Sequence, residues 1–244
     1  MNATRALGHP PFWCVDGTPA AHLEDSYLGQ AAVLIGGGPS FLEIDHGMIR
    51  RSGMLTMTVN NCVKTFRSDL WLGVDSPRKF DRSLWKDRRI TKFIPTKKAA
   101  YRRVARSVET YLYERSDAWC TEQIFAPGNT IHWYNELESG AKTSMVDAIR
   151  VLFVLGIRTI YLFGVDFFQT PTYGYHHKAR GFKKRIEGNN RIYHNLSARF
   201  ELMRPLMEAA GLHVYNCNPT SHLTAFEKRS FATEYSASML MHPE

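Results

Sequence analysis

The chain has 244 residues, of which 44% are hydrophobic and 22% charged, with a formal net charge of +8. This composition excludes disordered and fibrous chains, and a chain of this length can build a core without disulfides or a structural metal. No run approaches the roughly 18 apolar residues of a membrane span, and the start of the chain lacks the apolar core of a secretion signal, so we expect a cytoplasmic protein.

The first predicted element of the domain is a strand followed by a glycine turn. Residues 1–30 show no periodicity and are interpreted as an N-terminal extension. The apolar run Ala31–Ile35 predicts a buried strand, the turn Gly36–Ser40 follows at once, and Phe41–Ile44 opens a helical pattern. This order is typical of phosphate-binding loops, in which backbone N–H groups and a helix dipole attract the anion. A tight turn that requires glycine is the alternative interpretation.

Two further strands are predicted at Leu55–Val59 and Leu70–Val74, each followed by a polar residue, Asn60 and Asp75. Open parallel sheets bind ligands beyond the carboxyl ends of their strands, so both residues are candidate ligand contacts. Both residue types also start turns by bonding their own backbone, which leaves a purely structural role open.

Positive charge is concentrated in one segment. From Arg78 to Arg106, twelve basic residues stand against two acidic ones, a surplus larger than the net charge of the whole chain. Such a segment attracts anionic ligands, although a solvated surface kept soluble by charge would look the same. We interpret residues 78–138 as a basic, helical insertion or lid.

The clearest unit lies in the second half of the chain. Thr143 or Ser144 is predicted to cap a helix that ends at Gly156, and Thr159–Phe163 then predicts a fully buried strand. A further helix is predicted at residues 195–210, kinked or divided by Pro205.

A last strand is predicted at residues 212–216, and residues 227–244 form a C-terminal tail. Helices that alternate with buried strands predict an α/β fold with a Rossmann-like, mainly parallel sheet and helices on both faces. Residues 31–226 are expected to form one domain.

Several enzyme classes are excluded by their missing motifs. The chain contains no nucleoside-triphosphate P-loop, no GxGxxG, no DxD, no HExxH and no GxSxG. Its four cysteines form no CxxC pair or Cys/His cluster, so no zinc site and no disulfide framework is expected. His194 is the best candidate for a base that accepts a hydroxyl proton at neutral pH. A histidine near a helix start is more often a surface or capping residue.

Five separated blocks of the chain, in the same order and spacing, resemble the bacterial sialyltransferases that use CMP-sialic acid, the Campylobacter-type family of small α/β enzymes. Here Gly36–Ser40 matches the family's GNGPS turn, and Asn60 its next strand end. The segment Ile160–Gln169 is close to IYLSGIDFYQ, His194 falls at the catalytic base, and residues 218–226 resemble CPNSLLANF. The Thr143–Ser144 pair is shared as well.

The resemblance implies an inverting glycosyltransferase that needs no metal and no cofactor beyond its nucleotide-sugar donor, CMP-linked or similar. It implies that His194 is the general base and that Tyr173 and Tyr175 are the candidates for binding the leaving phosphate. The nucleotide site would comprise Gly36, Gly37, Gly38, Pro39, Ser40, Asn60, Asp75, Thr143, Ser144, Gly164 and Asp166. The missing DxD fits a leaving group stabilised by hydrogen-bond donors alone.

The acceptor is expected to be anionic, because the basic segment would lie near it. The candidate acceptor contacts are Arg78, Lys79, Arg82, Arg102 and Arg103. A surface glycan such as lipooligosaccharide and nucleic acid, as when a virus modifies its own DNA, both remain open, as does peripheral contact with a membrane.

Three positions depart from the family pattern, and two other functions stay open. Phe168 replaces the first phosphate-binding tyrosine, Ala141 replaces an arginine, and Gly37 replaces an asparagine. The 6-hydroxymethylpterin pyrophosphokinase-like proteins share the GxGPS turn; in that case ATP and magnesium would be used, with Asp75 and Asp166 as metal ligands. A scaffold that binds nucleotide or nucleic acid without catalysis is the remaining alternative.

Overall fold

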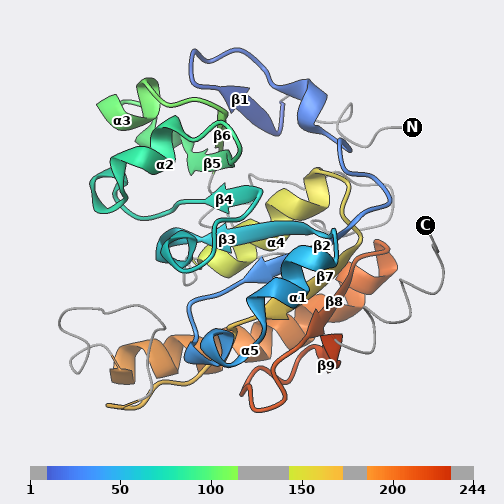
Figure 1. Cartoon of the computed structure of the whole chain (residues 1–244). Helices are drawn as coiled ribbons and strands as arrows, with labels where there is room; N and C mark the ends of the chain where they lie inside the picture. Colours follow the sequence, from blue (N-terminus) through green and yellow to red (C-terminus); the bar gives the residue numbers. More distant parts are fainter. Residues whose placement is uncertain (1–9, 115–142, 173–185, 232–244) are drawn as a thin grey trace.

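The computed structural model describes residues 10–114, 143–172 and 186–231 (Figure 1). In these residues nine strands form one sheet, in the order β1-β6-β5-β4-β3-β2-β7-β8-β9. All neighbouring strands are parallel except β1 and β6. The strands are β1 (Phe12–Cys14), β2 (Ala31–Ile35), β3 (Leu55–Val59), β4 (Leu70–Leu72), β5 (Thr91–Pro95), β6 (Thr110–Tyr113), β7 (Thr159–Phe163), β8 (His213–Asn216) and β9 (Glu227–Lys228).

Helices lie on both faces of this sheet, with α1 in front of it and α4 behind it in Figure 1. This arrangement follows from right-handed crossovers, because the connection from β2 to β3 and the connection from β6 to β7 run in opposite directions. The α-helices are α1 (His46–Arg51), α2 (Arg82–Lys86), α3 (Arg102–Ala105), α4 (Ser144–Val154) and α5 (Ile186–Ala209). The α/β fold class predicted from the sequence is confirmed.

The core is centred on β2, β3 and β7, whose residues are almost all buried. Their continuous apolar runs reflect packing on both faces, since helices cover each side of a parallel sheet. A second cluster lies under α2 and α3, where Trp71 packs edge-on against Phe80 and Trp85 with ring centroids 4.7 and 5.5 Å apart. In the described residues, Cys14 and Cys62 are free thiols.

The chain reverses its direction of travel across the sheet beside β2. From β2 it proceeds through β3, β4, β5 and β6 on one side, and α4 then returns it to β7 on the other side of β2. Ligands of open α/β sheets bind at such a switch point, beyond the carboxyl ends of the strands. A site is therefore expected beyond the carboxyl ends of β2 and β7.

The prediction of a helical insertion over residues 78–138 is wrong for its described part. Residues 78–114 contribute β5 and β6 to the main sheet, and their α-helices are short: α2 precedes β5, and α3 lies between β5 and β6. The N-terminal extension supplies β1, which pairs with β6, and the C-terminal tail supplies β9, which pairs with β8. Residues 115–138 lie outside the described residues.

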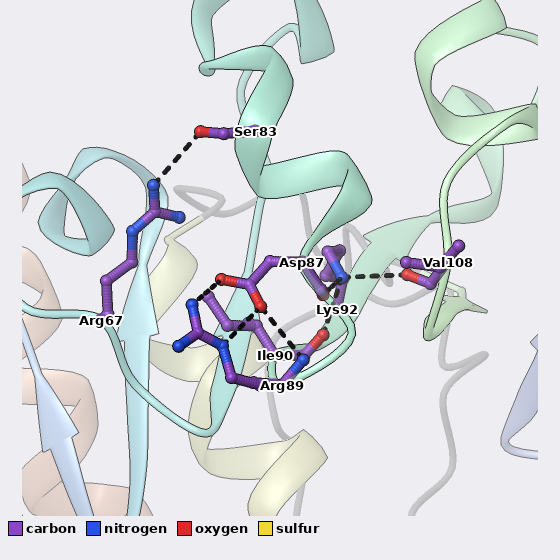
Figure 2. A network of polar contacts seen from close by, with 7 residues as sticks. All are labelled: Arg67, Ser83, Asp87, Arg89, Ile90, Lys92 and Val108. Atoms are coloured by element: carbon purple, nitrogen blue, oxygen red, sulfur yellow. Dashed lines mark hydrogen bonds and ion pairs between the residues drawn. The ribbon is translucent and has the colours of Figure 1, made fainter.

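The charged residue Lys92 explains why the sequence did not predict β5 as a strand. It belongs to the basic segment, yet its side chain is fully buried within the sheet. Its ammonium donates to the carbonyl oxygens of Asp87, Ile90 and Val108 at 2.6, 2.7 and 2.9 Å (Figure 2). Burial lowers the pKa of Lys92 to about 8, partly offset by the charges of Asp87 and Glu109. This lysine is thus a structural group of the strand, not part of a solvated face.

No described helix combines the length and the apolar character required to cross a bilayer.

Candidate functional site

The glycine turn after β2 packs directly against the loop after β7. The Gly38 N–H donates to the Gly164 carbonyl at 2.7 Å. The buried Asp166 carboxylate accepts from the Ser40 N–H at 3.1 Å and from the Ser40 hydroxyl. Asn218, which follows β8, also donates to Asp166, at 2.6 Å. Asp166 therefore joins three loops at the carboxyl edge of the sheet, beside the switch point.

The glycines are required by this close approach. A Cβ atom on Gly36 would lie 2.6 Å from the Gly164 carbonyl oxygen, and one on Gly38 would lie 2.7 Å from the same oxygen. Gly164 itself has a φ of +61°, which favours glycine. The tight-turn interpretation of these residues therefore has a direct physical basis.

The turn does not present several backbone N–H groups to a phosphate, as a typical phosphate-binding loop does. The N–H groups of Gly36, Gly38 and Ser40 already bond to acceptors within the protein, and Pro39 has none. The turn continues into a 3₁₀ helix of five residues, η3 (Pro39–Glu43), too short to supply a helix dipole. Within the described residues, the Gly37 N–H is the one backbone donor of the turn left for a ligand.

Asn60 shapes the neighbouring strand ends. It has a φ of +48°, which asparagine tolerates better than most residues. Its side-chain oxygen accepts from the backbone N–H groups of Val74 and Asp75, at 2.9 and 3.2 Å, and ties the end of β3 to the end of β4. The adjacent Asn61 oxygen is buried and has no hydrogen-bond partner in the part of the chain that the structure describes. The Asn61 oxygen at this edge is therefore available to accept a hydrogen bond from a ligand.

Asp75 and Asp166 do not form a metal-binding pair. Asp75 follows β4 and Asp166 follows β7, and β3 and β2 lie between those strands. Three inter-strand spacings separate them by about 14 Å, farther than two aspartate side chains reach. Asp75 instead pairs with Lys79 at 3.1 Å. Nowhere in the described residues do three or more His, Cys, Asp or Glu side chains gather as a metal site.

The N-terminus of α4 lies at the same edge of the sheet, because α4 runs back from it to the start of β7. Thr143 caps this helix, its hydroxyl accepting from the Met145 and Val146 N–H groups at 3.1 and 3.4 Å. This cap is one that the sequence predicts. Ser144, the first helical residue, is partly exposed.

His194 lies in the third turn of α5, exposed to solvent, and not at a helix start as predicted. Its helix is fixed to the loop after β7 by Gln169, which is buried. Asn190 accepts from the Gln169 N–H at 2.8 Å and donates to its carbonyl at 2.9 Å. Asn189 and Tyr193 bond the Gln169 side chain at 2.8 and 3.3 Å. Asn190 and His194 are four residues apart, so they lie on one helix face.

The two phenylalanines of the same loop turn toward different elements. Phe167 has a φ of +59°, a strained conformation for a bulky residue. Its ring stacks on Tyr193 of α5 at 5.1 Å, whereas the ring of Phe168 stacks on His222 at 4.3 Å. The predicted phosphate ligands Tyr173 and Tyr175 lie outside the described residues.

The basic segment divides into structural and exposed residues. Arg103 donates to the carbonyls of Pro77, Arg78 and Phe80 at 3.2, 3.0 and 2.8 Å and so fastens α3 to the turn after β4. Its guanidinium is therefore engaged within the protein. Five residues remain at or next to the carboxyl edge, after β4 and β5, and we call them the basic-edge group: Arg78, Lys79, Lys97, Lys98 and Arg102. Arg82, which begins α2, is also exposed.

Neither the bonds that Gln169 makes with α5 nor the position of His222 was predicted from the sequence. The polar run Gly188-Asn189-Asn190 reads as a loop, since these residue types disfavour helix interiors. Their bonds to Gln169 join residues about 20 positions apart in the chain, and no periodic pattern in the sequence indicates such a contact. Asn218 and Ser221 belong to a block that the sequence singled out, but that block gave no role to His222.

The fold resembles a solved sialyltransferase. The match is to CstII from Campylobacter jejuni, whose structure was determined in complex with a substrate analogue, cytidine-5'-monophosphate. The TM-score is 0.50 at 13% sequence identity, over 82% of this chain and 85% of that chain. The sequence matches no protein-family model and no curated protein. At this identity the likeness establishes the fold alone.

Proposed function

We propose that this protein is an inverting, metal-independent glycosyltransferase that moves a sugar from a CMP-linked or similar nucleotide sugar to a hydroxyl of an anionic acceptor. The observation that carries the proposal is that three loops meet at the switch point. The glycine turn, the loop after β7 and the loop after β8 are far apart in sequence, and they meet through Asp166. These are the blocks that resemble CMP-sialic acid-dependent enzymes, and they lie on a fold of the same kind.

His194 takes the role of general base. It is exposed, and the bonds between Gln169 and α5 hold its helix beside the loop after β7. The imidazole accepts the proton of the acceptor hydroxyl as the oxygen attacks the anomeric carbon. Attack occurs on the face opposite the departing nucleotide, so the anomeric configuration inverts. The nucleotide leaves with the bonding electron pair, and hydrogen-bond donors stabilise its phosphate without a metal.

The acceptor is an extended anion. The basic-edge group follows β4 and β5, whereas His194 belongs to the helix held against the loop after β7. Four inter-strand spacings between β5 and β7 amount to about 19 Å. A small acceptor does not touch both places, but a charged polysaccharide or a nucleic acid strand does. These two polymers remain the candidate acceptor classes.

Cleavage of a nucleotide sugar in the absence of acceptor tests the proposal. The protein is expected to hydrolyse CMP-linked sugar slowly, releasing CMP, in buffer that contains EDTA. His194→Ala should lower the rate of cleavage by at least about 100-fold and leave CMP binding unchanged, since the base acts in the chemical step. His213→Ala, an exposed histidine at the start of β8, is the matched control. Equal rates in His194→Ala and the wild type would remove His194 from the mechanism, and nucleotide binding without cleavage would indicate a non-catalytic scaffold.

A further inference from the structure

The loop after β8 is held in place by hydrogen bonds of its buried side chains. Asn218 donates to Asp166, and its oxygen accepts from the Thr220 N–H at 3.0 Å and the Thr220 hydroxyl at 2.9 Å. The buried Ser221 hydroxyl donates to the Val165 carbonyl at 2.5 Å and accepts from the Leu223 N–H at 3.0 Å. This loop is thereby locked against the end of β7.

His222 is the one residue of this locked turn that carries an imidazole, and it is held at two points. Its backbone N–H donates to the Asp166 carbonyl at 2.8 Å. Its ring stacks on Phe168 with centroids 4.3 Å apart and planes 23° apart. The residues on either side, Ser221 and Leu223, are buried, whereas His222 is exposed. Its ring nitrogens have no hydrogen-bond partner among the described residues, so an N–H donor is presented to solvent.

A phosphate at the switch point needs donors beyond the glycine turn. Three N–H groups of that turn are already bonded, and the Asp166 carboxylate sits against Ser40. A carboxylate repels a phosphate placed directly within the turn. The side chain of Phe168, in the adjacent loop, has no polar atom that could bind a phosphate. His222 lies beside Phe168 and Asp166, with its imidazole free to donate.

We propose that His222 donates an N–H hydrogen bond to the phosphate of the bound nucleotide and stabilises it as a leaving group. This inference rests on the proposed function. In the reaction, the bond between the anomeric carbon and the phosphate oxygen breaks, and its electron pair remains on that oxygen. The acceptor oxygen forms the new bond to carbon and gives its proton to His194. The His222 N–H faces the phosphate oxygen on which negative charge grows.

Comparison of CMP with cytidine isolates the phosphate contact. By calorimetric titration in EDTA, His222→Ala is expected to weaken CMP binding by about tenfold or more, because a hydrogen bond to a charged group is lost. Cytidine, which has no phosphate, should bind the variant and the wild type equally. His213→Ala serves as the control and should bind both compounds normally. An unchanged ratio of CMP to cytidine affinity in His222→Ala would overturn the inference.

A second variant separates hydrogen bonding from stacking. His222→Phe keeps a ring to stack on Phe168 but carries no N–H, so its unfolding temperature should match that of the wild type. It is expected to lose CMP affinity as His222→Ala does and to cleave the donor about 100-fold more slowly. Full CMP affinity in His222→Phe would show that the ring, not its N–H, matters, and would contradict the proposal.

The outcome for the wild type distinguishes the two proposals. If the wild type binds CMP, UMP, AMP and GMP no better than their nucleosides, the proposed function fails, and this inference fails with it. If the wild type binds one of these nucleotides and His222→Ala binds it equally, the inference alone fails.

Discussion

Asp166 shows how a residue type that suggests ligand binding can serve to organise a site. Both of its carboxylate oxygens accept hydrogen bonds from other loops, from Ser40 and from Asn218. Buried polar groups of this kind are costly to leave unpaired, so the three loops are fixed relative to one another. The glycines of the turn also organise the site, because the absence of a Cβ atom lets the Gly164 backbone pack against the turn.

Gly38→Ala tests this packing. The new Cβ would lie 2.7 Å from the Gly164 carbonyl oxygen, a backbone atom that cannot move aside alone. The free energy of unfolding should fall by about 1–3 kcal/mol, as for other overpacked sites, measured by urea denaturation. Gly188→Ala is the control: a Cβ there meets nothing within 4 Å, and its helical position should make alanine stabilising by roughly 0.5–1 kcal/mol. A neutral Gly38→Ala would refute the packing argument.

Lys92→Met tests the buried ammonium and its pH dependence. At pH 7 the variant should be less stable by about 2 kcal/mol, because three carbonyl oxygens lose their donor. The folded-state pKa of about 8 lies below the ordinary value of 10.5, so from pH 8 to 10.5 the unfolded wild type binds more protons than the folded one. Wild-type stability relative to Lys92→Met should therefore rise with pH there, by up to about 1.4 kcal/mol per unit. A difference that does not change with pH would show an unperturbed lysine.

Helix α5 carries the proposed base, and its first turns are held in place by tertiary bonds. Gln169 is bonded by three residues of α5, and Phe167 stacks on one of them, Tyr193. The helix also continues through Pro205, so this proline does not divide it. The position of His194 therefore depends on the contact between two elements.

Asn190→Ala should loosen this contact. The variant loses both bonds to the Gln169 backbone, so we expect the Gln169 amide to exchange its hydrogen at least about tenfold faster, measured by native-state hydrogen exchange. Asn195→Ala, on the same helix and exposed, is the matched control and should leave that rate unchanged. An equally protected Gln169 amide in Asn190→Ala would mean that other contacts hold the helix.

Strands buried on both faces could be predicted from the sequence, and elements defined by polar contacts could not. The structure gives β2, β3 and β7 the bounds that their apolar runs predict. The strand β5 was missed because Lys92 lies in it, and a buried lysine looks like a surface residue until its carbonyl partners are known. The start of α5 was missed for a similar reason, since Asn189 and Asn190 favour helix only through Gln169.

Across the whole molecule, the candidate base and the basic-edge group lie on different sides of the switch point. The sheet order places β7 on one side of β2, and β4 and β5 on the other. A long anionic acceptor that crosses the carboxyl edge would be bound by charge at one end and modified at the other. The affinity of the protein for this acceptor would then depend on the basic-edge group, and not on the net charge of the protein alone.

The double variant Arg78→Ser/Arg102→Ser tests that arrangement. Binding of a single-stranded 20-nucleotide DNA should weaken, and the slope of log affinity against log salt should become shallower by about 1–2, because fewer counterions are released. The control is Lys86→Ser/Arg88→Ser, since these exposed residues precede β5 at the opposite edge of the sheet. Equal losses in both double variants would indicate diffuse attraction to the whole protein.

The central claim is that the switch point binds a donor nucleotide without metal, and a thermal-shift panel tests it most directly. CMP, CDP, UMP, UDP, GDP and ATP would each be added with EDTA or with magnesium. A ligand at 100 times its dissociation constant stabilises by about 2.7 kcal/mol, which raises the unfolding temperature by several degrees. We predict such a shift with CMP in EDTA. A shift with ATP and magnesium alone, or none with any nucleotide, would contradict the claim.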